Sequence, residues 1–229
     1  MNYWLGIDDT DNLESRGTGH LARFMAQSLA IDFEVAGVTR HQLLDDPRVP
    51  MTAKNSCAAI LFSGPAYPLA DLAAYVRKMM LDDFQPGSDP GYCLGTQIAA
   101  PISAFGQRAQ RQVVRQQEAR QLAASHGLWL EGLAGTQDGV IGALAAVGLA
   151  ALGEDGRYVL TGKIRELEGL VTVDAILAAG IQAVLTMDGS PVTQGLVLAD
   201  RLRPARRQAR PVLYVEAGEN GHWQPLKLN

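Results

Sequence analysis

The sequence predicts an α/β protein in which helices cover a mixed β-sheet. Short apolar runs, typical of buried strands, alternate along the chain with longer amphipathic stretches, which are typical of helices. A chain of 229 residues with 47% apolar and 19% charged residues can bury a sizeable core and has the composition of an ordinary globular protein. No internal repeat and no low-complexity tract interrupts the alternation.

The first half of the chain supplies most of the predicted sheet. The apolar run 3–7 predicts a strand, because the acidic turn that follows cannot continue a buried ladder. Apolar residues at helical spacing predict a helix over 18–30, with Thr18 in the position of an N-cap. The elements expected next are strands at 34–40 and 57–63, an amphipathic helix at 67–84 with Pro68 in its first turn, a Gly/Pro-rich loop at 85–96, and a long helix at 102–127 that Gly127 ends.

The second half continues the alternation. A short strand at 128–133 leads through a Gly-rich segment, 135–142, into an apolar helix. The elements expected after it are strands at 157–161, 181–187 and near 211–216, a helix at 173–179 and a turn at 188–191. No clean linker precedes about residue 165, so we predict one domain over 1–165. Residues 166–229 form a C-terminal α/β extension that is either a smaller lobe or integral to that domain.

Charge and cysteine content narrow the class of protein. The net charge of −4 gives no overall positive field that would attract nucleic acid. Cys57 and Cys93 are too few for a four-cysteine zinc site and are expected to be reduced thiols. The longest apolar stretch, 140–153, is shorter than the ~20 residues of a membrane-spanning helix, and the N-terminus has no signal pattern. We therefore expect a cytoplasmic protein without a membrane partner, and its oligomeric state, a homodimer included, stays open.

Three carboxylates are crowded into the turn after the first strand. Asp8, Asp9 and Asp11 repel one another unless water, hydrogen-bond donors or a cation offset their charge. Strand alternation would send Asp8 and Asp9 to opposite sides, whereas a turn that begins at Asp9 would bring two or three carboxylates around one point. Since Mg²⁺ takes one or two carboxylates together with phosphate oxygens and water, the turn is a candidate Mg²⁺ site.

A Gly-Thr-Gly step, Gly17 to Gly19, follows this turn and opens the next helix. Free amide groups and the positive end of the helix dipole favour phosphate at such a position. Acids for a metal and a helix start for phosphate together predict a nucleoside triphosphate site. Two alternatives remain at this point: a strand-to-loop turn without a ligand, because Asp, Thr and Asn are common turn residues, and an aspartate-nucleophile phosphatase, to which "DTDN" supplies two acids one residue apart.

Two further segments bring polar residues to the ends of predicted strands. The first holds donors that are either ordinary strand-end residues or reach phosphates, namely Arg40, Lys54 and Asn55. The second is a Gly-rich turn before the apolar helix, and its candidate residues are Gly135, Thr136 and Asp138. Two strand-to-helix turns of this composition in one chain are a stronger indication of a phosphate site than either turn alone.

Several motifs occur together in one order along the chain. "GIDDTDN" is followed by "GTGHLA", by "TRHQLLDDPRVPMTAKNSCAAIL" and "FGQRAQRQVVRQQEARQLA", and then by "GTQDGVIGALAAVG". In these segments, from about residue 3 to about residue 165, the chain resembles the kinase-like domain of the archaeal enzymes that agmatinylate a cytidine in isoleucine tRNA. The resemblance implies an ATP- and Mg²⁺-dependent phosphotransfer domain, whose family activates a base carbonyl with phosphate before an amine displaces it.

The resemblance also implies roles for single residues. The three aspartates of the first turn would hold Mg²⁺ and orient the phosphates. Thr18 matches the threonine that the family autophosphorylates, so it is a phosphoacceptor, a hydroxyl that contacts phosphate, or a simple helix N-cap. His20 would contact phosphate or act as an acid or base, unless it is structural. Lys54 and Asn55 would contact the nucleotide or the second substrate.

The last part of the chain departs from that family. The family carries an oligonucleotide-binding barrel and a zinc ribbon after the kinase-like domain, and residues 166–229 match neither. This part holds a basic cluster that either binds phosphates of RNA or a nucleotide or is a solvated loop: Arg201, Arg203, Arg206, Arg207 and Arg210.

The predicted function is therefore that of a Mg²⁺-dependent, ATP-using phosphotransferase or phosphate-activating ligase. Its partners are ATP and an unidentified small-molecule or nucleoside acceptor, and no accessory domain supports RNA. The alternatives from other classes are a noncatalytic nucleotide- or metal-binding module, a subunit whose RNA-binding modules reside on another chain, and the phosphatase.

Overall fold

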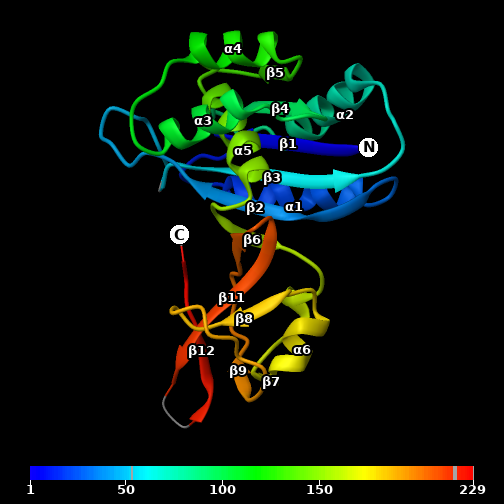
Figure 1. The fold of residues 1–229 in the computed structure, drawn as a ribbon. Coiled ribbons are helices and arrows are strands. Elements are labelled where there is room, and N and C mark those ends of the chain that lie inside the picture. Colours follow the sequence, from blue (N-terminus) through cyan, green and yellow to red (C-terminus); the bar gives the residue numbers. More distant parts are fainter. Residues whose placement is uncertain (53, 219–220, 229) are drawn as a thin grey trace.

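Six antiparallel strands form the sheet of the N-terminal part of the molecule (Figure 1). The computed structural model describes residues 1–52, 54–218 and 221–228. In spatial order, the strands are β5 (Trp129–Gly132), β4 (Gly91–Gly95), β1 (Asn2–Asp8), β3 (Ser56–Ser63), β2 (Glu34–Gln42) and β6 (Arg157–Leu160). The central strands β1 and β3 pair from Asn2 with Ser63 to Ile7 with Ala58.

Helices cover both faces of this sheet. Side chains alternate along β1, so Tyr3, Leu5 and Ile7 pack on one face while Trp4 packs on the other. The first face is covered by α1 (Thr18–Leu29) and α2 (Leu69–Asp82), and the second by α3 (Ala100–Ala109), α4 (Gln116–Ser125) and α5 (Gly139–Leu152). The result is a three-layer α/β/α arrangement, which confirms the predicted fold class.

Helix α5 lies so close to the sheet that it requires glycines. A Cβ at Gly6 in β1 would lie 2.1 Å from the carbonyl oxygen of Ala143, and a Cβ at Gly142 would lie 1.7 Å from Asp8 Oδ2. The helix is buried on almost every side, as its near-continuous apolar sequence predicts. Its N-terminus is thereby fixed beside the acidic turn at the end of β1.

The C-terminal part has a hydrophobic core of its own, built around Ile176, Val197 and Leu213. Its elements are the 3₁₀ turn η1 (Ile164–Glu166), β7 (Leu170–Thr172), α6 (Val173–Ala178), β8 (Ala183–Leu185), β9 (Leu196–Leu198), β10 (Ala205–Arg207), β11 (Arg210–Ala217) and β12 (Trp223–Pro225). Strand β6 pairs with β2 on one side and with β10 on the other, so it joins the two parts. Figure 1 shows this smaller part below β6.

Two predicted elements are wrong. The expected long helix over 102–127 is two helices, α3 and α4, because the β-branched pair Val113 and Val114 disfavours a helix and Val114 packs into the core. The expected loop over 85–96 contains β4, whose Gly91 lets the strand approach the backbone of α5. The short strands β7, β9, β10 and β12 were not predicted either.

Within the described residues, no helix combines the length and apolar character needed to cross a membrane. Cys57 and Cys93 are both buried and both free.

Candidate functional site

Two clefts meet where β1 ends. The first, the acidic cleft, has a volume of about 1150 Å³ and is lined by carboxylates from the end of β1, from the loop before β4 and from the start of α5. The second, the basic cleft, has a volume of about 1190 Å³ and lies between the start of α1, strands β2 and β6, and the loop after β9. The two clefts share a wall that consists of Asp11, Thr18, Thr52, Lys54 and Ser56.

The acidic turn changes direction at Asp9. Its φ of 51° is left-handed, a conformation that Asp tolerates better than most residues. Burial raises the pKa of Asp8, and the charges of Asp9 and Asp11 raise it further. Burial also raises the pKa of Asp9, to about 6, with the charges of Asp89 and Asp11 adding to the effect. Among the described residues no side-chain donor reaches Asp8 or Asp9, so their negative charge is poorly compensated.

Asp11 has a different environment, because hydroxyl groups hold it. Thr18 Oγ1 donates to Asp11 Oδ1 at 2.8 Å, and Thr52 Oγ1 donates to Asp11 Oδ2 at 3.0 Å. The Thr18 backbone amide also donates to Asp11 Oδ1, at 3.3 Å, so the carboxylate caps α1. The N-cap residue of this helix is Gly17, and the prediction of Thr18 as its N-cap is wrong.

The second Gly-rich turn is closed around a carboxylate that the sequence analysis missed. Asp89 accepts hydrogen bonds from the backbone amides of Thr136, Gln137 and Asp138, at 3.1, 2.5 and 3.2 Å. It therefore occupies the position that the sequence pattern assigned to a phosphate. Thr136 and Asp138 line the acidic cleft, whereas Gly135 lines neither cleft. The available signal for Asp89 was its place in a long Gly/Pro-rich loop.

The described residues of the acidic cleft do not form a preformed metal site. Among the residues that the structure describes, no three His, Cys, Asp or Glu side chains are grouped to hold a metal ion. Asp8 and Asp9 remain as oxygen donors for a cation that brings further ligands with it. Away from these acids the cleft is lined by apolar side chains, namely Leu43, Leu44, Val49, Pro50, Met51, Val113, Val114 and Ile141.

Several residues that were predicted to contact phosphate line the basic cleft, whereas Asp8 and Asp9 line the acidic cleft. Those that line the basic cleft are Gly17, Gly19, His20 and Arg40. His20 is hydrogen-bonded to Arg16 Nη1 through its Nε2, at 2.7 Å. Lys54 is exposed on the shared wall. Asn55 lines the acidic cleft, but its side-chain amide donates to the carbonyl oxygen of Leu44 at 2.8 Å and so ties two loop segments together.

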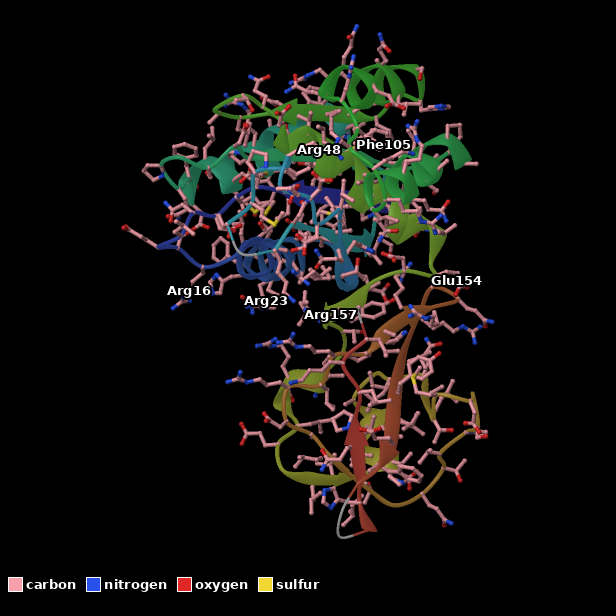
Figure 2. All side chains as sticks on the ribbon, turned by 90° about the vertical axis from the view of Figure 1, so that its left-hand side faces the viewer. Arg16, Arg23, Arg48, Phe105, Glu154 and Arg157 are labelled. Carbon is pink, nitrogen blue, oxygen red and sulfur yellow. The ribbon has the colours of Figure 1, made fainter. Side chains whose placement is uncertain are left out.

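The arginine cluster of the C-terminal part is not one surface patch. Arg206 is buried, and it donates to the carbonyl oxygen of Ala150 and to the hydroxyl of Tyr158. Of the five arginines, only Arg201 and Arg203 line the basic cleft. In Figure 2, Arg16 and Arg23 lie on the lower side of the N-terminal part, beside Arg157 at the boundary with the C-terminal part.

No protein-family model matches the chain, and no curated protein matches it. Its structure is similar to that of a tRNA fluorescent labeling enzyme, with a TM-score of 0.58, 25% identity, and coverage of 65% of this chain and 36% of that one. It is also similar to TiaS, a tRNAIle2 agmatidine synthetase. The complex of TiaS with this tRNA and ATP has a TM-score of 0.57, and the complex with the tRNA, AMPCPP and agmatine has a TM-score of 0.56. Both are 25% identical over 65% of this chain and 36% of the TiaS chain.

The chain therefore spans about a third of the length of these proteins. The comparison confirms the resemblance on which the sequence analysis relied, as a similarity to part of an agmatidine synthetase. It supports the fold of an ATP-using ligase.

Proposed function

We propose that this chain is a Mg²⁺-dependent, ATP-using phosphotransferase or phosphate-activating ligase. One observation carries the proposal: the poorly compensated carboxylates of Asp8 and Asp9 lie in the same cleft as the Thr18 hydroxyl, which donates to Asp11. Carboxylates for a metal beside a held hydroxyl are the parts that phosphoryl transfer needs. The similarity to TiaS, whose structure includes a complex with ATP, supports the nucleotide.

The acidic cleft fits each part of a Mg²⁺-bound nucleotide. Its apolar side chains suit a base, and Asp8 and Asp9 would hold Mg²⁺ together with phosphate oxygens. Gly142 fits this arrangement, because any larger residue would displace the Asp8 carboxylate. When bound, the metal neutralises charge on the phosphates. Asp89 already accepts hydrogen bonds from the backbone amides of the second Gly-rich turn, so these amides are not free to bind phosphate. We therefore assign the phosphates to the end of β1 and the shared wall.

The shared wall is the proposed place of transfer. Lys54 would neutralise charge on the terminal phosphate, and Asp11 holds the Thr18 hydroxyl in position. If Thr18 is the first acceptor, as the resemblance implies, its oxygen bonds to the γ-phosphorus while the bond to the leaving ADP breaks. The proton of the hydroxyl then passes to Asp11, which already accepts its hydrogen bond.

Isothermal titration calorimetry with a non-hydrolysable ATP analogue tests the nucleotide site. We expect the wild type to bind the analogue only with Mg²⁺, and Asp9→Asn to weaken binding by about tenfold or more, since a charged metal ligand is lost. Asp32→Asn is the matched control, because it removes an exposed carboxylate that lines neither cleft. Analogue binding that needs no Mg²⁺ and survives Asp9→Asn would exclude the proposed site.

Activity assays separate this proposal from its alternatives. Tight Mg²⁺-dependent binding without any ATP consumption would favour a noncatalytic nucleotide-binding module. Release of phosphate from a small phosphomonoester in the absence of ATP would favour the aspartate-nucleophile phosphatase.

A further inference from the structure

We propose that the basic cleft binds a small molecule that carries phosphate groups, and that this molecule is the second substrate. Its status as a substrate rests on the proposed function, whereas the binding itself rests on the arginines of the cleft alone. Among the described residues, eight arginine and lysine side chains line the cleft, against three carboxylates. They are Arg16, Arg23, Arg40, Lys54, Arg157, Arg165, Arg201 and Arg203, and the acids are Asp11, Glu168 and Asp200.

The centre of the cleft is a pair of like charges on neighbouring strands. Arg40 in β2 lies directly opposite Arg157 in β6, and like charges in that register destabilise a sheet. Arg203 adds a third charge from the loop before β10: burial lowers the pKa of Arg157 to about 10, and the charges of Arg40 and Arg203 contribute. Among the described residues, none of these three arginines forms an ion pair with a carboxylate.

Arg157 also carries an unused donor. Its Nε is buried and has no hydrogen-bond partner among the described residues. A buried donor without an acceptor is costly, and a guanidinium fork matches the oxygens of a phosphate group. An anion between Arg40, Arg157 and Arg203 would reduce the repulsion, and a turn of the Arg157 side chain toward the anion would give its buried Nε an acceptor. Such an anion is the ligand that the three side chains fit.

The place of the cleft suits a second substrate. Asp11, Thr18 and Lys54 belong to its wall and to the wall of the acidic cleft, so an occupant of either cleft reaches the same group of side chains. Strand alternation sends Arg40 to the side of α1, with Val38, and Asp8 to the side of α5, with Trp4. The two clefts thus approach Thr18 from opposite faces of the sheet, as a donor and an acceptor would.

The lining of the cleft favours a small anion over other ligands. A cationic amine such as agmatine, which one TiaS complex contains, would be repelled by the arginines. Single-stranded RNA is held by stacking on exposed aromatic rings. Among the described residues that line the cleft, Tyr158 is 3% exposed and the ring of His20 is hydrogen-bonded to Arg16. A phosphate-bearing small molecule needs neither an amine site nor a stacking surface.

Titration of the full chain with inorganic pyrophosphate in the presence of EDTA tests the proposal. Without metal the carboxylates of the acidic cleft repel pyrophosphate, so binding reports the basic cleft. We expect Arg157→Gln and Arg203→Gln each to weaken binding by about tenfold or more, since each removes a charge-assisted hydrogen bond. Arg210→Gln is the matched control, because Arg210 is an exposed arginine that does not line the cleft. Circular dichroism verifies the fold of each variant.

A second titration, with the ATP analogue and Mg²⁺, distinguishes the possible outcomes. The analogue should bind the pyrophosphate-saturated wild type and the Arg157→Gln variant with unchanged affinity. Equal loss of analogue and pyrophosphate binding in Arg157→Gln would overturn the proposal, because the basic cleft would then be the nucleotide site. Unchanged pyrophosphate affinity in both arginine variants would also overturn it.

Two other results are decisive. An RNA hairpin that displaces pyrophosphate in an Arg157-dependent, salt-sensitive way would overturn the proposal in favour of RNA. If pyrophosphate binds through Arg157 and Arg203 while the wild type binds no nucleotide, the proposed function fails and the anion site stands.

Discussion

At the scale of single residues, the hydroxyl of Thr18 is the best-positioned candidate acceptor. It is buried, donates to Asp11 at 2.8 Å and accepts from Thr10 at 3.2 Å. After incubation with ATP and Mg²⁺, we expect the intact mass of the wild type to increase by one phosphoryl group. Thr18→Val should abolish the increase, because it keeps the shape of the side chain and removes the nucleophile.

Thr18→Ser is the control for that experiment, since it keeps the hydroxyl. A mass increase that persists in Thr18→Val would show that Thr18 is not the acceptor. Calorimetry on the same variant shows whether the nucleotide still binds.

His41, which is buried, pairs with the half-buried Asp155. His41 Nδ1 and Asp155 Oδ2 are 2.8 Å apart, and Thr39 Oγ1 lies 2.8 Å from His41 Nε2. Burial lowers the pKa of His41, and the charges of Arg206 and Arg40 lower it further. The hydrogen bond and the charge of Asp155 raise this pKa, but they offset the lowering only in part. Burial raises the pKa of Asp155, but hydrogen bonds from His41 and Gln110 outweigh it and the net shift is downward. A neutral His41 therefore donates to an ionised Asp155.

We expect acid to destabilise the protein in two steps because of this pair. The unfolded chain protonates its histidine near the ordinary pKa of 6.5, above that of folded His41, so the free energy of unfolding falls as the pH drops below that value. Protonation of Asp155 lowers the free energy of unfolding further. This second loss begins below the ordinary aspartate pKa of 3.8 and continues as the pH falls toward the lower pKa of Asp155 in the folded protein. The histidine step approaches a slope of about 1.4 kcal/mol per pH unit.

Urea unfolding measured between about pH 8 and pH 5 tests the first step. His41→Gln should flatten that slope, because an amide replaces the titrating ring. An equal slope in His41→Gln would assign the pH dependence to other groups.

At the scale of elements, helix α5 fixes the acidic cleft through its glycines. A Cβ at Gly142 would lie 1.7 Å from Asp8 Oδ2, so Gly142→Ala must displace the carboxylate or the helix. We expect Gly142→Ala to weaken Mg²⁺-nucleotide binding by about tenfold or more, through loss of a metal ligand. Calorimetry with the ATP analogue measures the effect.

Gly148→Ala is the matched control on the same helix. Its Cβ would lie 2.3 Å from the backbone carbonyl oxygen of Ile102, away from the carboxylates, so it should lower thermal stability and leave nucleotide affinity unchanged. Equal effects of the two variants on affinity would mean that α5 supports the site only through overall stability.

Much of the sheet could be predicted from the sequence, because its strands are apolar and bounded by polar turns. Strands β1, β2 and β3 lie within two residues of their predicted bounds. Strand β4 could not be predicted, since glycines flank its three apolar residues. Gly91 is needed for close contact with the backbone of α5, and Gly95 for close contact with the side chain of Leu128. The role of Asp89 could not be predicted either, because the backbone amides that donate to it, those of 136–138, are distant in sequence.

At the scale of the whole molecule, the sequence could not show that the candidate residues divide between two clefts. The acids precede "GTG" by only a few positions, yet Asp8 and Asp9 line the acidic cleft whereas Gly17 and Gly19 line the basic cleft. Strand alternation likewise places Asp8 and Arg40 on opposite faces of the sheet. Arg157 belongs to no sequence motif, because β-sheet pairing alone brings it opposite Arg40. Arg203 belongs to the basic cluster of the sequence, but the sequence did not show that it lies in the same cleft as Arg40. The basic cleft is thus a consequence of how the two parts of the chain pack.

We propose that residues 1–165 and 166–229 fold as two units, which is one of the two alternatives that the sequence left open. Separate hydrophobic clusters support this division. The two units are joined where β10 and the turn after it are hydrogen-bonded to the segment 150–158, through Arg206 and the backbone among others. The C-terminal unit has the smaller hydrophobic core, which favours its opening before the N-terminal core. Hydrogen exchange in low denaturant should therefore show faster exchange in β8 and β11 than in β1 and β3.

A ligand that touches both units should stabilise their association, whereas a ligand of one unit should not. The basic cleft is lined by α1 and β2 and also by the segment 198–203, but the described residues that line the acidic cleft all belong to the first unit. We expect pyrophosphate to slow hydrogen exchange in β8 and β11, and the Mg²⁺-bound ATP analogue to slow it only around β1 and α5. Equal protection of β8 and β11 by both ligands would contradict the division of the clefts between the two units.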